Sequence, residues 1–240
     1  MEIFTNDGIL LLGRWVHILA GITWIGLLYY FNFVQTPFFA EIEPDVRTTA
    51  VRKLVPRALL WFRYAALLTF LAGVFIIILR LAWTGTILLG SSYWVSILTG
   101  MVLGTLMFLN VWLVIWPNQK IVIASAERVA SGGEADPRAA DAGRRGLLMS
   151  RTNVVFSIPM VFFMATASHL VLFGPETSSV GKWAYGVVAA VVIAAVQLNA
   201  MSGLTGTTKR PLEKIESTIL WGGILWAVLY FFLQLFTRGG

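Results

Sequence analysis

Long apolar stretches alternate with short polar segments along the whole chain. Each apolar stretch has roughly 20 residues, the length that an α-helix needs to cross the hydrocarbon core of a bilayer at about 1.5 Å per residue. The alternating pattern of membrane β-strands is missing, and backbone amides in lipid must bond within a helix. The chain is therefore predicted to be an all-α, polytopic membrane protein: a single domain, residues 1–240, built as a bundle of six transmembrane helices. The predicted spans lie near residues 9–31, 59–83, 93–116, 152–173, 183–201 and 218–236.

Two of the polar segments between these spans are longer than the others. The first, TPFFAEIEPDVR, contains Pro37 and Pro44, which we expect to break the helix. The second, residues 118–150, is predicted to be a cytoplasmic linker with some helix, after Trp116 and Pro117 close the third span. Its Ala, Gly, Asp and Arg content is typical of a linker, and it lacks the Gly-Lys pair of a phosphate-binding loop.

Basic residues give the predicted orientation. The chain has 18 Lys and Arg residues and a net charge of +6, and most of these residues lie in the loops after the first, third and fifth spans. Cytoplasmic loops carry such an excess, so both termini are predicted to be external. The same distribution indicates a topology signal rather than a nucleic-acid-binding surface. The basic residues outside these loops are Arg14, Arg63, Arg80, Lys182 and Arg238.

Composition narrows the class of protein further. The charged fraction is 12%, against about 25% in soluble domains, and 58% of the residues are hydrophobic. The absence of cysteine excludes disulfides, thiolate nucleophiles, cysteine-ligated iron–sulfur clusters and covalently attached c-type haem within these residues. The acidic, polar start MEIFTNDG does not resemble a cleavable signal peptide, so the first span is expected to act as the insertion signal. We expect a multi-pass protein of a bacterial inner (plasma) membrane.

The two histidines of the chain, His17 and His169, lie inside predicted spans, where an ionisable side chain indicates a functional site. Odd spans run inward and even spans outward, so both rings are predicted in the outer half of the membrane, about one helical turn apart in depth. Gly13 and Gly21 flank His17 on the same helical face and leave room for a flat macrocycle. Arg14, one turn nearer the outer surface, is placed to meet an anionic group such as a haem propionate.

These residues favour a b-type haem held between two helices, with His17 and His169 as axial ligands of the iron. The alternative is that each histidine only hydrogen-bonds across a helix contact, where small residues are common without any ligand. Zinc would lack its third and fourth ligands, and a proton relay would lack a nearby buried carboxylate. Other polar residues in the spans are predicted to bond between helices or, together, to line a cytoplasmic polar cleft; they include Asn110, Asn153, Ser157, Gln197 and Asn199.

Four motifs in order carry a resemblance to a known family: GRWVHILAGITWIGLLYYFNFVQ, LVPRALLWFRYAALLTFLAGV, GTLMFLNVWLVIWPNQK and SRTNVVFSIPMVFFMATASH. They resemble the N-terminal membrane domain of the cytochrome c-linked urate oxidases, also called membrane urate hydroxylases. The resemblance spans roughly residues 13–173, and the last two spans match only in hydropathy. It implies urate oxidation, with electrons passing to a C-terminal c-type cytochrome domain outside the membrane. It implicates, without assigning roles, Trp15, His17, Trp24, Asn110, Trp112, Arg151, Asn153, Ser168 and His169.

The sequence departs from that family in one respect, because a c-type domain needs a Cys-x-x-Cys-His attachment and these residues contain no cysteine. The chain is therefore expected to lack the C-terminal cytochrome c domain and to use a separate electron acceptor.

Three hypotheses follow. The leading one is a membrane redox protein that binds one b haem and hands electrons to an external cytochrome c. The others are a urate oxidase membrane domain acting with a separate cytochrome c, and a non-catalytic subunit of a larger respiratory complex. A transporter fits less well, because the spans lack paired charges and broken helices. The expected partners are the bilayer, an external cytochrome c or respiratory subunits, and further copies of the chain in an oligomer.

Overall fold

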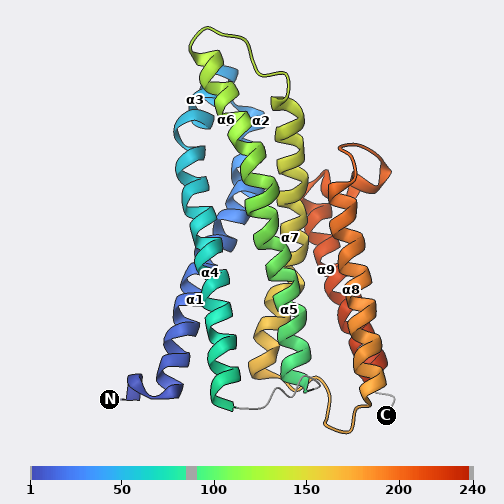
Figure 1. The fold of residues 1–240 in the computed structure, drawn as a ribbon. Coiled ribbons are helices and arrows are strands. Elements are labelled where there is room, and N and C mark those ends of the chain that lie inside the picture. Colours follow the sequence, from blue (N-terminus) through green and yellow to red (C-terminus); the bar gives the residue numbers. More distant parts are fainter. Residues whose placement is uncertain (1, 85–90, 238–240) are drawn as a thin grey trace. The chain divides into compact units, whose positions relative to one another are not determined.

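The computed structural model describes residues 2–84 and 91–237, so Arg238, used above for the orientation, lies outside the described residues. Most of the described residues are helical, and they contain no strand (Figure 1). Its helices are α1 (Asn6–Tyr29), α2 (Thr36–Glu41), α3 (Pro44–Lys53), α4 (Val55–Thr84), α5 (Ser92–Leu109), α6 (Trp116–Ala130), α7 (Ala139–His169), α8 (Ser179–Met201) and α9 (Ile215–Thr237). Short 3-10 helices lie at Glu2–Phe4 and Thr207–Leu212, and π-helical turns at Tyr30–Gln35 and Asn110–Ile115.

Six helical segments are long and apolar enough to cross a membrane, which confirms the predicted class of all-α, multi-pass membrane protein. The segments are Asn6–Glu41, Val55–Trp83, Ser92–Ala130, Ala139–His169, Ser179–Met201 and Ile215–Thr237. Large apolar side chains on their surfaces, such as Leu11 and Ile22, are more than half exposed. Such exposure suits lipid and not water, because the apolar surface is far more extensive than a soluble monomer shows.

The first and third of these segments continue through a proline by way of a π-helical turn. In the first, the N–H of Thr36 donates to the carbonyl of Phe31, five residues earlier, and the helix runs on past Pro37. In the third, Trp116 donates in the same way to Val111, and the helix runs on past Pro117. A proline removes one N–H and its ring clashes with the carbonyl four residues earlier, so a widened turn just before it keeps the helix intact.

The prediction that Pro37 breaks the first helix is therefore wrong, and so is the prediction that the Trp116-Pro117 pair closes the third. Pro44 behaves as predicted: the helix ends at Glu41, and Pro44 begins α3, where its missing N–H is not needed. The segment predicted as a linker, residues 118–150, is mostly helix, because α6 extends to Ala130 and α7 begins at Ala139.

The helices form two compact units. Unit 1 comprises residues 1–87 and 108–150, and α1 packs along α4 within it. Leu28 of α1 and Phe62 and Ala66 of α4 are fully or almost fully buried. Phe31 meets Phe62 edge to face at 5.4 Å between ring centroids, an arrangement that suits the charge distribution of aromatic rings.

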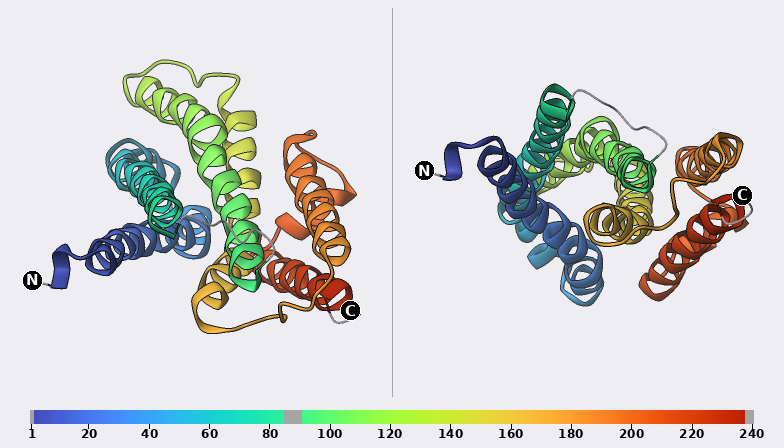
Figure 2. Two further views of the ribbon diagram at one scale, coloured as in Figure 1. Left: turned by 60° about the horizontal axis from the view of Figure 1, so that its bottom comes forward. Right: turned by 90° about the horizontal axis from the view of Figure 1, so that it is seen from below.

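Unit 2 comprises residues 88–107 and 151–240. Helix α7 is the most buried of the six membrane segments, and its residues 151–169 belong to unit 2. Phe156 and Phe163 of this part are inaccessible to solvent. Glycine lets neighbours approach α7, since a Cβ on Gly100 would lie 3.0 Å from Cγ of Met164. Helices α8 and α9 lie side by side in both views of Figure 2.

We expect the substitution Gly181→Ala to destabilise unit 2, because an alanine Cβ there would collide with the carbonyl oxygen of Phe236 in α9. That atom belongs to backbone and cannot rotate away, so helices α8 and α9 must separate, at a cost of about 1–3 kcal/mol. Gly186→Ala is the matched control, because nothing lies within 4 Å of its Cβ position in the same helix. Thermal unfolding in detergent tests the pair; equal midpoints for the two variants would contradict the close contact.

Candidate functional site

His17 of α1 faces α4 and bonds to its backbone. The ring Nδ1 donates to the carbonyl oxygen of Thr69 at 2.8 Å. A carbonyl only accepts, so in the neutral ring Nδ1 carries the hydrogen and Nε2 keeps the lone pair. Metal-binding histidines are commonly fixed in this way, by a carbonyl at the nitrogen that does not bind the metal. The same bond would also satisfy a histidine that only joins two helices.

Gly73 makes this contact possible. A Cβ at Gly73 would lie 3.1 Å from Cε1 and 3.3 Å from Nδ1 of His17, closer than such atoms usually approach. An alanine there would press on the imidazole, so the glycine allows the ring to reach the α4 backbone. Gly73 was not among the predicted site residues. A glycine within the apolar run LTFLAGV was the only indication in the sequence.

The predicted neighbours of His17 also face α4. A Cβ on Gly13 would lie 3.1 Å from Cγ1 of Ile76, and one on Gly21 would lie 3.8 Å from Cγ2 of Thr69. The structure thus gives both glycines a helix-packing role, and their part in binding a macrocycle stays a prediction. Arg14 is half-buried on the adjacent turn.

His169 belongs to unit 2, whereas His17 belongs to unit 1. It is the last residue of α7, and its side chain is exposed, as is that of Ser168. Phe162, two helical turns before it in α7, packs with Trp226 and Tyr230 at centroid distances of 5.3 and 5.8 Å. The joint ligation of one iron by His17 and His169 stays a prediction.

Two polar residues implicated by the family resemblance make structural bonds in unit 2. The guanidinium of Arg151 is buried and donates from Nη1 to the carbonyl oxygens of Leu212 and Glu213. Asn153 donates to the carbonyl oxygen of Met107 in α5 at 3.0 Å. These bonds confirm for Asn153 the predicted role as a link between helices, and they show that Arg151 holds the segment before α9.

The tryptophans that the family resemblance implicates lie in different environments within unit 1. Trp15 is exposed, whereas Trp24 is buried. Trp112 meets Tyr64 edge to face at 6.0 Å. The guanidinium carbon of Arg63 lies 3.6 Å from the ring centroid of Trp116, a cation–π contact that lets this charge remain within an apolar helix.

Unit 1 also contains a cavity of about 470 Å³, which the sequence did not predict. It lies at the end of the unit where α2, α3, α6 and the start of α7 meet, opposite the N-terminus (Figure 1). Residues from five helical segments line it: Phe31, Asn32, Gln35, Thr36, Phe39, Ala40, Arg47, Val51, Val55, Leu59, Phe62, Ile115, Gln119, Val122, Ala139, Ala140, Gly143, Arg144, Gly146, Leu147 and Ser150. The sequence offered one indication of this cavity, the polar residue Gln35 just before the Thr36-Pro37 pair in YFNFVQTP.

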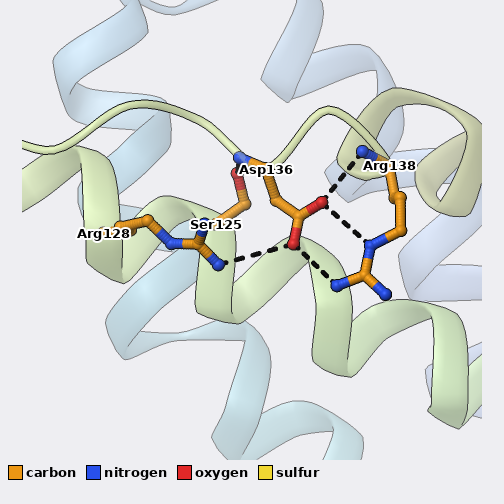
Figure 3. Close-up of polar contacts among 4 residues, drawn as sticks. All are labelled: Ser125, Arg128, Asp136 and Arg138. Atoms are coloured by element: carbon orange, nitrogen blue, oxygen red, sulfur yellow. Dashed lines mark hydrogen bonds and ion pairs between the residues drawn. The ribbon is translucent and has the colours of Figure 1, made fainter.

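An ion pair orders the loop that leads from α6 into this cavity wall. Asp136 accepts from the backbone N–H and the guanidinium of Arg138, at 2.9 to 3.1 Å, and from Arg128 at 3.4 Å (Figure 3). The backbone N–H of Asp136 in turn donates to Oγ of Ser125 at 2.9 Å. The hydrogen bonds from Arg138 hold the pKa of the Asp136 carboxyl well below its ordinary value of 3.8.

This lowered pKa predicts a loss of stability in acid. The carboxylate of Asp136 stabilises the folded loop at every pH above its ordinary value of 3.8, and this contribution is lost as the pH falls below that value. At neutral pH we expect Asp136→Asn to be less stable than wild type, with the difference shrinking below about pH 4. Thermal unfolding over a pH series measures it. Glu134→Gln in the same exposed loop is the control, and a difference that does not depend on pH would contradict the ion pair as its cause.

Comparisons with known proteins give one match. A model of the urate oxidase N-terminal family matches residues 82–212, which is more than half of the chain. No curated protein and no solved structure matches the chain. The matched range contains the third and fourth motifs and continues through α8, beyond the predicted limit near residue 173; the first two motifs lie before it.

Proposed function

Because more than half of the chain matches its model, this protein belongs to the urate oxidase N-terminal family, and we propose from this membership that it is the membrane domain of a urate-oxidising system. Six apolar helices of sufficient length support the membrane part of the proposal. In this role the chain binds urate, and the electrons removed from urate leave to an external cytochrome c. We place it in a bacterial inner membrane with both termini on the outer side, as the distribution of Lys and Arg indicates.

Turnover by the purified protein tests this function. The protein in lipid nanodiscs is given urate together with either a soluble cytochrome c or ferricyanide, and both urate loss and acceptor reduction are followed. We expect urate-dependent reduction of at least one acceptor, and none with heat-denatured protein. An artificial acceptor is included so that the lack of a natural partner does not hide activity. No reduction of either acceptor would contradict the proposal and favour a non-catalytic subunit, which should co-purify with respiratory subunits in a fixed ratio.

A b-type haem at His17 is a second proposal, favoured by one specific observation. The bond from Nδ1 to Thr69 leaves Nε2 with its lone pair, and no partner for Nε2 is found among the described residues. Neutral imidazole with this tautomer is the usual donor to haem iron, so the residue fits the group. A haem bound here would supply a one-electron carrier within the membrane.

In this second proposal, each residue has a limited task. His17 provides the donor nitrogen, and the carbonyl of Thr69 keeps the ring from turning. Gly73 holds open the space that the ring needs. Arg14 would pair with a propionate, and His169 would supply a second donor nitrogen to the iron. The two proposals are compatible, since a carrier in the membrane suits an enzyme that delivers electrons to an external cytochrome.

A further inference from the structure

We infer that the cavity of unit 1, lined by Asn32, Gln35, Arg47 and Arg144, is the urate-binding site, and that it selects a flat anion with N–H groups. This inference rests on the proposed function for the substrate, whereas the site itself is argued from the cavity. No motif of the family resemblance assigned a role to these four residues.

Asn32 supplies the main observation. Its side chain is only 2% exposed, and Nδ2 donates to the carbonyl of Leu28 and to Oγ of Ser150, both at 2.8 Å. Because the Leu28 carbonyl can only accept, the orientation of the amide is fixed and Oδ1 points elsewhere. Within the described part of the chain, Oδ1 is buried without a hydrogen-bond partner. A buried acceptor without a hydrogen bond lowers the stability of the fold by about 1–3 kcal/mol. A ligand that donates a hydrogen bond to Oδ1 would remove this cost.

Gln35 repeats the pattern in the same π-helical turn. Its Oε1 is buried and lacks a partner among the described residues, and it lines the same cavity. The turn that carries both amides exists because of Pro37, and widened turns of this kind are frequent at functional sites. Two acceptors on one wall favour a ligand with at least two N–H donors.

The charge of the cavity favours an anion. Arg47 from α3 and Arg144 from α7 line it, and no Asp or Glu belongs to the described lining. Two arginines in a described lining that contains no acidic residue give a positive potential in a partly enclosed space. The cavity therefore combines two amide oxygens that lack hydrogen-bond donors with two positively charged side chains in its lining.

The remaining walls are apolar and suit a flat ring. Phe31, Phe39 and Phe62 are aromatic, and Val51 and Leu59 add aliphatic surface. A cavity of about 470 Å³ lies within the range of small-molecule sites, about 300–1,000 Å³, and holds one bicyclic heterocycle with some water. Urate carries ring N–H groups, carbonyl oxygens and a negative charge on a flat frame. Inorganic phosphate and lipid phosphate offer few or no donors to Asn32 and Gln35, so they match only the arginines.

Thiol labelling tests the site directly, because the natural chain has no cysteine. Ala140→Cys places one thiol in the cavity lining, at an exposed residue that a maleimide can reach. Ser131→Cys, exposed and outside the lining, is the matched control. We expect urate to slow the labelling of the Ala140→Cys protein roughly tenfold at saturation, with little effect on the Ser131→Cys protein and with inorganic phosphate without effect on either.

A negative charge introduced on the amide wall gives the second measurement. Gln35→Glu keeps the side-chain shape and adds a negative charge, so we expect urate affinity in equilibrium dialysis to fall by roughly tenfold or more. Asn118→Asp is the matched control, since Asn118 is half-buried on α6 next to the lining residue Gln119 and donates only to its own helix at Val114.

The possible outcomes distinguish a failure of the proposed binding site from a failure of the proposed function. If wild type oxidises urate but urate protects neither thiol, the cavity is not the site and the proposed function stands. If urate protects only the Ala140→Cys protein and wild type oxidises no urate, the site stands and the catalytic proposal fails. If phosphate protects as well as urate does, the cavity is an anion site of the phosphate or lipid-headgroup class, and the inference is wrong. If Gln35→Glu binds urate as tightly as wild type, the amide wall does not recognise the ligand.

Discussion

Under the proposal that His17 binds a b-type haem, a His17→Ala variant is expected to bind no haem. Alanine removes the donor nitrogen, and the ring that is lost was held by Thr69 and given space by Gly73. The bond from the histidine nitrogen to the iron would hold the haem in the protein, so no other change of one side chain in unit 1 should reduce the haem content as much. The Soret and alpha bands of the oxidised and dithionite-reduced protein measure the effect.

Two controls make the result specific to the ligand. Gly26→Ala lies on the same helix with nothing within 4 Å of its Cβ position, and it should keep full haem content. A His17→Gly variant should regain haem when free imidazole is added, which a purely structural role for the ring would not allow. Wild-type protein without a Soret band, or a His17→Ala protein with full haem, would contradict the proposal. His169→Ala tests the second ligand in the same way.

Arg151→Met is expected to lower the free energy of unfolding by about 2–4 kcal/mol, the largest effect on stability that we predict from one buried contact. The buried guanidinium donates to the carbonyls of Leu212 and Glu213, which end the 3-10 helix and precede α9. Methionine fills a similar volume but leaves both carbonyls without this donor. Unfolding in detergent, followed by helical circular dichroism, measures the change.

Arg145→Met is the control for this prediction, because Arg145 is an exposed arginine on the same helix and should change stability by less than about 0.5 kcal/mol. Arg151→Lys should fall between the two, since one ammonium cannot reproduce the planar fork of the guanidinium. An Arg151→Met protein as stable as the Arg145→Met protein would show that the bonds to Leu212 and Glu213 contribute nothing.

The membrane helices followed from sequence, because hydropathy over a long window directly reflects whether a segment can be inserted into lipid. The predicted span 59–83, for example, lies within the observed helix α4, whereas the predicted span 152–173 runs four residues past the end of α7 at His169. Helix ends were harder to predict. Pro37 and Pro117 are ordinary helix breakers in a sequence, yet both lie in continuous helices, because a widened turn before each proline restores the hydrogen bonding.

The residues of the candidate sites were predicted unevenly. His17 was found because an imidazole is rare in an apolar span, whereas Gly73 and the Thr69 carbonyl were not found, since they belong to another helix and have no unusual composition. Asn32 and Gln35 were missed for a related reason. A single amide in an apolar run usually bonds between helices, and only its position relative to the other four segments shows that an acceptor is left over.

The sequence by itself determined the class of this protein: its helices, their apolar length and its family motifs, all of which depend on residues close together in the chain. Tertiary structure alone decided which nitrogen of His17 carries the hydrogen, that the glycines of α1 pack on α4, and that five helical segments enclose a cavity with two unsatisfied amide oxygens. The physical reason is that insertion into lipid is a property of each helix, whereas a hydrogen bond or a cavity needs atoms from several helices at fixed distances.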